Sequence, residues 1–97
     1  MKKEYPVYWA PEAEETYLEI LAYILEKWTV IEAEDFEQKV ESLLTRLSQH
    51  KYLCPASQKH KQFRKCVITP QTSLIYRVAN QAIELVTFID NRSAHKY

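Results

Sequence analysis

The stretch FRKCVITPQTSLIYRVANQAIELVTFI, residues 63–89, decides the fold. Its three apolar, partly alternating runs are typical of β-strands, and we expect strands over 63–69, 73–79 and 83–89. Only three residues separate each run from the next, whereas a parallel crossover needs a dozen or more. The strands must therefore form an antiparallel meander. Because the chain has no glycine, Asn80 is the best candidate for a left-handed turn position.

Two amphipathic helices precede the meander. Over 12–28, apolar side chains recur every three or four residues, which places them on one face of a helix. Pro11 suits the first turn, where a missing N–H breaks no hydrogen bond. Thr29 and Glu32 fit a capping box that starts a second helix, which extends to about His50. The connection is so short that the two helices must pack as an antiparallel hairpin.

A short strand over 5–9 precedes the helices, and Pro6 favours its start or a sheet edge because proline has no N–H to donate. The segment 51–62 lacks periodicity, so we expect a loop there. The amphipathic hairpin has to bury its apolar face against the sheet. We therefore expect a single domain over 1–97 with a two-layer α+β fold. Its helical hairpin packs on a small, mostly antiparallel sheet, in the order strand–helix–helix–strand–strand–strand.

Composition and charge bound the function. Hydrophobic residues make up 46% and charged residues 27%, as in an ordinary globular domain. No apolar run approaches the ~20 residues of a membrane span, and no signal segment is evident, so we expect a cytoplasmic protein. Residues 1–48 hold 5 Lys/Arg against 11 Asp/Glu, a balance of −6, and residues 49–97 hold 8 against 2, a balance of +6. This asymmetry indicates separate acidic and basic surfaces, unless solvated helices simply favour Glu.

The two cysteines are expected to be free thiols. Cys54 and Cys66 lie in a chain without a secretory signal, and disulfides are rare in the cytoplasm. Their spacing relative to His50 and His60 lacks the tight pairs of known zinc modules. We therefore expect no metal site and no cofactor.

The chain contains WAPEA at 9–13, Trp28 followed by Ala33 and Phe36, Leu47, Pro55, LIYRV at 74–78 and FIDNR at 88–92. These motifs, in this order of elements, resemble those of the RelE/ParE superfamily of toxins from type II toxin–antitoxin modules. The resemblance spans nearly the whole chain, and the long hairpin is closer to the ParE-like, plasmid-stabilisation branch. It implies a toxin that a cognate antitoxin neutralises. Such toxins either cleave mRNA at the ribosome without a metal or poison DNA gyrase without chemistry of their own.

The ribonuclease branch of the family implies a set of catalytic residues. Metal-free RNA cleavage needs a base, an acid and cations for the charged phosphorane. The resemblance assigns these roles to Arg64, Arg92, His95 and Tyr97. Cys66 and Ser73 depart from the template, since ribonuclease members tend to have basic residues there. We expect ribosome-dependent mRNA cleavage. The alternatives are a gyrase inhibitor or a degenerate member that only binds a partner.

A second set of cations is expected to contact RNA phosphates or an acidic antitoxin segment: Lys59, Lys61, Lys65 and Arg77. Ion pairs are the structural alternative for two arginines, since Arg77 can pair with Glu84 across the hairpin and Arg92 with Asp90. We expect Tyr76 and Phe88 in the core, and Trp9 and Trp28 at the rim between the hairpin and the sheet.

Overall fold

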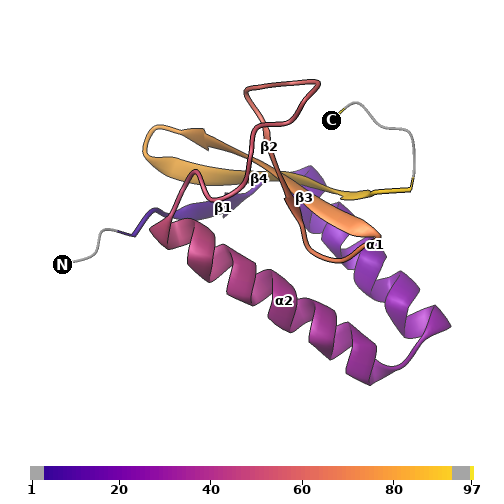
Figure 1. The fold of residues 1–97 in the computed structure, drawn as a ribbon. Coiled ribbons are helices and arrows are strands. Elements are labelled where there is room, and N and C mark those ends of the chain that lie inside the picture. The colour runs from indigo at the N-terminus through magenta and orange to yellow at the C-terminus, as the bar shows by residue number, and fades with distance from the viewer. Residues whose placement is uncertain (1–3, 93–96) are drawn as a thin grey trace.

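The computed structural model describes residues 4–92 and 97, and these residues form the two expected layers (Figure 1). The sheet has the order β1-β4-β3-β2. Its strands are β1 (Val7–Trp9), β2 (Arg64–Val67), β3 (Thr72–Ala79) and β4 (Ala82–Asp90). Helices α1 (Pro11–Lys27) and α2 (Val30–Gln49) lie on the same side of this sheet. β1 pairs in parallel with β4, and the other neighbours are antiparallel, so the predicted fold class is confirmed.

The helices start and end where their sequences indicate. Pro11 is the first residue of α1, and α2 follows a capping box in which the Thr29 N–H donates to the Glu32 carboxylate at 3.0 Å. The buried stripe of α2 is formed by Ala33, Phe36, Val40, Leu43 and Leu47. The last four of these side chains share a core cluster with buried residues of the sheet, which accounts for the 3.6-residue period of this segment.

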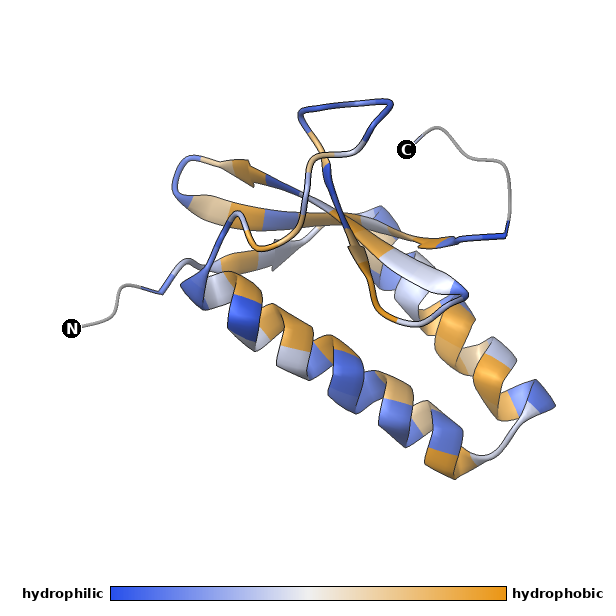
Figure 2. Cartoon of the chain, in the orientation of Figure 1, coloured by the Kyte–Doolittle hydropathy of each residue, from blue (hydrophilic) through white to orange (hydrophobic). Residues whose placement is uncertain are grey.

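The core lies between the two layers. From the sheet it receives Leu74, Tyr76, Ile83, Leu85 and Phe88, all buried. Trp9 packs its ring against Tyr17, with ring centres 5.3 Å apart, and occupies the expected rim position. Trp28 follows the last turn of α1 and is 63% exposed, and it also lies at the rim, where it lines a cleft together with Phe88 of β4. Figure 2 shows hydrophilic colouring at the apex of the loop between α2 and β2, whereas Leu53 and Cys54 of the same loop pack against this core.

The turn between β3 and β4 is tight. Asn80 and Gln81 have φ angles of 54° and 59°, and Ala79 pairs with Ala82 on either side of them. Two central residues with positive φ are typical of the type I′ turn, whose twist matches that of the flanking strands. The prediction for Asn80 is therefore confirmed, and Gln81 adopts the same conformation.

The side of β4 that faces away from β3 is covered by two different elements. β1 pairs only with Ile83–Leu85, the first half of β4. Further along, the Thr16 hydroxyl of α1 accepts a hydrogen bond from the Phe88 N–H at 3.0 Å. A helix side chain thus satisfies a donor that a longer β1 would otherwise have paired. No helix within residues 4–92 is long and apolar enough to cross a membrane.

Candidate functional site

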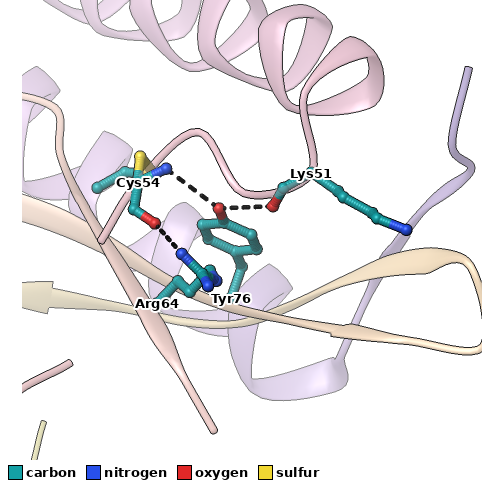
Figure 3. Close-up of a disulfide and its surroundings, with 5 residues drawn as sticks. Lys51, Cys54, Arg64 and Tyr76 are labelled. Atoms are coloured by element: carbon teal, nitrogen blue, oxygen red, sulfur yellow. Dashed lines mark hydrogen bonds between the residues drawn. A yellow bond between two sulfur atoms is a disulfide. The ribbon is translucent and has the colours of Figure 1, made fainter. Parts of the chain in front are cut away.

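The segment 51–63 between α2 and β2, called the basic loop below, is anchored by a core residue. Tyr76 is fully buried, and its hydroxyl donates to the Lys51 carbonyl at 2.9 Å and accepts from the Cys54 N–H at 3.3 Å (Figure 3). Burial raises the pKa of the Tyr76 hydroxyl, so the group stays protonated and can donate. The sequence predicted Tyr76 only as a core residue. The alternation of apolar residues along the strand indicates burial, but it does not indicate which groups the hydroxyl bonds.

Arg64 begins β2 beneath this loop. Its Nη1 donates to the Cys54 carbonyl at 2.6 Å, and its guanidinium lies 4.7 Å from the centre of the Tyr52 ring (Figure 3 shows the first contact). The Lys51 ammonium lies 5.3 Å from the same ring. Tyr52 is 60% exposed and was not singled out from the sequence, although an aromatic residue next to a lysine in a polar loop is a usable signal.

The prediction of free thiols is wrong, because Cys54 and Cys66 form a disulfide. Their Cα atoms are 5.4 Å apart, within the range that a disulfide can bridge. The proximity arises because the basic loop folds back along β2, where the Lys65 N–H donates to the Pro55 carbonyl at 3.1 Å. Neither the spacing of the two cysteines nor the expected cytoplasmic location indicated that the loop folds back along β2. Cys66 is 2% exposed and pairs with Leu74 in the β2–β3 register.

The two arginines with an expected ion-pair partner both form that pair. Arg77 Nε lies 2.5 Å from Glu84 Oε1, directly across the β3–β4 register. Arg92 donates from Nε and Nη2 to the two carboxylate oxygens of Asp90, at 3.0 and 2.9 Å. The hydrogen bonds from Arg92 lower the pKa of the Asp90 carboxyl to about 2. Both guanidinium groups therefore face a carboxylate of the same chain, in ion pairs that are exposed to solvent.

Ser73, one of the departures from the ribonuclease template, has a structural role. It is fully buried, and its hydroxyl donates to the side-chain oxygen of Asn91 at 2.7 Å. The Asn91 amide in turn donates to the carbonyls of Thr69 and Pro70, each at 3.3 Å. This network joins the end of β4 to the turn between β2 and β3. It fixes the backbone immediately before Arg92.

The predicted catalytic arginines are not brought together. Arg64 lies in the row of the sheet that contains Tyr76, whereas Arg92 lies beyond the row that pairs Thr72 with Asp90. Four residues of β3 separate these rows, which is roughly 13 Å at the rise of a β-strand. His95 lies outside the described residues. Within residues 4–92 and 97, the expected set of cations does not converge on one point.

Tyr97 instead lies against the basic loop. The Ser57 hydroxyl donates to its carbonyl at 2.7 Å, and its ring centre is 5.4 Å from that of Phe63 and 6.3 Å from that of His60. The apex of this loop and the C-terminal end both lie on the side of the sheet away from the helices (Figure 1). His60 was considered in the sequence only as a metal ligand, because its approach to Tyr97 depends on the tertiary fold.

The predicted binding lysines are divided between the loop and the strand. Lys59 and Lys61 are exposed on the basic loop, whereas Lys65 is half-buried on β2 opposite Ile75. Arg77 lies elsewhere, in the last third of β3 close to the turn at Asn80. The basic surface therefore centres on the loop, and Arg77 is not part of it.

A cleft of about 600 Å³ lies between the helical hairpin and the far end of the sheet. Its apolar lining includes Ile20, Tyr23, Ile24, Trp28, Phe36 and Phe88, and its charged lining includes Glu19, Glu32, Asp35, Lys39, Asp90 and Arg92. At the adjacent hairpin end, Ile31 is 76% exposed. Arg92 is thus a residue of this cleft rather than of the basic loop. Exposed apolar side chains of this size are typical of a partner-binding surface.

Fold and cleft together define a small toxin-like α+β domain, and comparison with known families agrees. Residues 7–94 match the model of the ParE toxin of the type II toxin–antitoxin system parDE. The chain belongs to this family, and hence to the RelE/ParE superfamily. No curated protein sequence matches it.

Solved structures share the fold at low sequence identity. The chromosomal ParDE system of P. aeruginosa contains a chain with TM-score 0.76 and 13% identity, covering 91% of this chain and 97% of that one. The YoeB/ParE toxin of Agrobacterium tumefaciens has TM-score 0.67 and 13% identity, covering 89% of this chain and 98% of that one. The RelBE2 toxin–antitoxin complex of Mycobacterium tuberculosis contains a chain with TM-score 0.64 and 13% identity, covering 96% of this chain and 98% of that one. Both ParE-type and RelE-type toxins are thus similar in fold, and fold does not select between their mechanisms.

Proposed function

We propose that this toxin arrests growth by binding and poisoning DNA gyrase, as the ParE-like branch does, and that a cognate antitoxin neutralises it. The main observation behind this proposal is that three arginines are already bonded within the protein. Arg77 and Arg92 are paired with carboxylates, and Arg64 donates to a backbone carbonyl. Metal-free RNA cleavage needs several cations around one phosphate, and these three arginines lie at separate places along the sheet and just beyond it. The match to the ParE family model also supports gyrase as the target.

The test compares both targets with the same purified, antitoxin-free protein. Gyrase poisoning is measured as accumulation of linear DNA from a supercoiled plasmid. Ribosome-dependent cleavage is measured in an in vitro translation reaction by mapping mRNA ends. We expect linear DNA to accumulate and the mRNA to stay intact. New mRNA ends that require ribosomes, together with unaffected gyrase, would reverse the assignment.

A second candidate function, mRNA cleavage, is favoured by one observation. The Tyr97 ring centre lies 6.3 Å from that of the His60 imidazole, and Lys59 and Lys61 flank His60 in sequence. An imidazole and a phenol are suitable proton-transfer groups. If the protein cleaves mRNA, His60→Gln should lower the cleavage rate by roughly 10²-fold or more. His50→Gln, at an exposed histidine that caps α2, is the matched control and should leave cleavage unchanged.

The antitoxin is proposed to cover the cleft and the exposed hairpin end. Trp28 lines the cleft and is 63% exposed, so a partner that buries its ring would gain affinity from it. Trp28→Ala should weaken antitoxin binding by roughly 10-fold or more in a titration calorimetry experiment. Tyr8→Ala is the matched control, since Tyr8 is 60% exposed and does not line the cleft. Equal losses for both variants would place the antitoxin elsewhere.

A further inference from the structure

We propose that the Cys54–Cys66 bridge is a reversible thiol–disulfide site that exchanges with low-molecular-weight thiols of the glutathione class. In its oxidised form the bridge fixes the basic loop against β2. In its reduced form the segment between the two cysteines opens more often, while the hydrogen bonds at Cys54 keep the two thiols near each other. This inference goes beyond the proposed function, and its chemistry does not depend on the identity of the toxin's target.

The position of the bridge makes it accessible from one side. Cys54 is half-buried in the irregular basic loop, whereas Cys66 is 2% exposed. β2, which carries Cys66, is a four-residue edge strand. A bridge between a loop and an edge strand can be opened without separating the two main layers. Attack is therefore expected at the Cys54 sulfur, because thiol exchange requires an approach to the sulfur that is attacked.

The exchange balances as follows. A glutathione thiolate attacks Cys54 Sγ, the bond to Cys66 Sγ breaks, and Cys66 leaves as a thiolate that takes up a proton. A second glutathione thiolate attacks the glutathione sulfur of the mixed disulfide. This step releases Cys54 as a thiolate, which is protonated, and forms oxidised glutathione. Two electrons pass from two glutathione thiols to the protein bridge, and oxidised glutathione restores the bridge by the reverse steps.

Reversibility requires the two thiols to stay close after reduction, and the loop has contacts that keep them so. The Tyr76 hydroxyl bonds both Lys51 and Cys54, and Arg64 donates to the carbonyl of Cys54 itself. The Lys65 N–H donates to the Pro55 carbonyl. These hydrogen bonds flank the bridge on both sides and need no disulfide. They raise the effective concentration of one thiol near the other, which favours re-formation of the same pair.

Reduction should loosen the part of the loop that the bridge encloses. Cys54 and Cys66 are 12 residues apart, and the enclosed segment contains the exposed residues Lys59 and Lys61. A disulfide acts largely by restricting the open states of the chain that it encloses. Without it, opening is limited by the hydrogen bonds above and by those within the segment, such as the bond from the Ser57 N–H to the Phe63 carbonyl at 2.8 Å. Arg64 is released whenever Cys54 moves away.

The first test titrates the oxidised full-length protein with glutathione buffers of increasing reduced fraction. The reaction is quenched with a maleimide polymer, and a gel counts the modified cysteines. We expect both thiols to appear together, with half-reduction inside the range of cytoplasmic glutathione buffers, and the bridge to re-form on return to the oxidised buffer. A protein that stays fully oxidised at the most reducing buffer, or that does not re-form the bridge, would overturn the proposal.

The second test asks whether the bridge fixes the loop. Trypsin cleavage after Lys59 and Lys61 should be roughly 10-fold faster in the reduced protein, because local opening limits proteolysis of an ordered segment. Cleavage after Lys27 and Lys39, at the end of α1 and within α2, is the internal control and should not change. Equal loop cleavage in both forms, or equal acceleration at all four sites, would contradict the proposal.

The double substitution Cys54→Ser with Cys66→Ser should show the fast loop cleavage at every glutathione ratio. If this variant does not fold, the two tests on the unmodified protein still decide the proposal. Neither readout involves gyrase or the ribosome. Failure to poison gyrase would therefore overturn the proposed function alone, and failure of thiol exchange would overturn this inference alone.

Discussion

At the scale of single residues, the hydroxyl of Tyr76 links the core to the functional surface. The ring belongs to the apolar layer between sheet and helices, while the oxygen reaches the backbone of the basic loop at two points. The loop therefore takes its position from a residue on a different element. A substitution that keeps the ring separates the two roles.

Tyr76→Phe should destabilise the protein by about 1–3 kcal/mol, because the buried Lys51 carbonyl and Cys54 N–H lose their shared partner. The measurement is the free energy of unfolding from urea denaturation of the oxidised protein. Tyr8→Phe, at an exposed tyrosine on β1, is the control and should stay within about 0.5 kcal/mol of the unmodified protein. No difference between the two variants would show that the loop does not depend on this hydroxyl.

The Asp90–Arg92 pair predicts a specific acid response. The pKa of Asp90 is lowered from its ordinary value of 3.8 to about 2 by the hydrogen bonds from Arg92. The stabilisation is therefore fully present above the unfolded pKa and is lost as the pH falls from about 4 through about 2. Nuclear magnetic resonance titration of the Asp90 carboxyl should report the low pKa. In Arg92→Gln the value should return towards 3.8, and an unchanged titration would refute the pair.

At the scale of elements, the tight meander explains why a chain without glycine reaches this fold. The β3–β4 turn needs two residues with positive φ and fills both positions with polar side chains, Asn80 and Gln81. Asn tolerates this region better than other non-glycine residues, because its short polar side chain can bond locally. The turn is thus a place where local conformational cost is accepted to keep the register of the two longest strands.

The turn can be tested by substitution at a single position. Asn80→Val should cost about 1–2 kcal/mol, because a β-branched residue is unfavourable at a φ of 54°. Asn80→Gly should be neutral or stabilising, since glycine adopts positive φ without a steric penalty. Thermal unfolding of the two variants, compared with the unmodified protein, measures both effects. Equal melting temperatures for Val and Gly would contradict the type I′ assignment.

Periodicity predicted the elements of this fold because each of them buries a face. The stripe of α2 and the alternation in β3 and β4 are direct consequences of packing against the other layer, so the sequence contains them. The parallel pairing of β1 could not be derived in the same way, since an edge position does not state which neighbour it has. The bridge between Cys54 and Cys66 was missed because it depends on the path of an aperiodic loop.

The candidate site was less predictable than the fold for a related reason. Ion pairs between residues directly opposite or two apart, as for Arg77 and Arg92, follow from register and spacing, and the sequence indicated both as alternatives to a binding or catalytic role. Contacts across layers and loops do not. The approach of His60 to Tyr97 and the bond from Arg64 to Cys54 join segments whose relative placement is set only by the complete fold.

At the scale of the whole molecule, charge follows the two layers. The surfaces of α1 and α2 carry most of the acidic residues, whereas the cations of the second half of the chain concentrate on the basic loop and β2. A molecule with this polarity presents opposite fields to a partner on its two sides. The direction from which a charged partner approaches is therefore selected before contact.

This polarity predicts salt-dependent association with a purified cognate antitoxin. Raising the salt concentration from about 50 mM to about 500 mM should lower the association rate constant by roughly 10-fold or more, with a smaller change in the dissociation rate constant. Stopped-flow fluorescence measures both constants. Glu19→Gln, in the lining of the cleft that the antitoxin is proposed to cover, should reduce the salt dependence, whereas Lys61→Gln, on the basic loop, should not reduce it. A rate constant insensitive to salt would rule out steering.

The pairing of β1 with β4 also governs the order of events during folding. Val7 pairs with Ile83, so the first strand finds its neighbour only after the two helices, the basic loop and the rest of the meander have been synthesised. The hairpin and the meander consist of local contacts and can form early, whereas this pairing closes a long loop and has to come late. A nascent chain therefore carries its first strand unpaired until the fourth is made. The completed sheet, and with it the competent toxin, marks the end of synthesis of the domain.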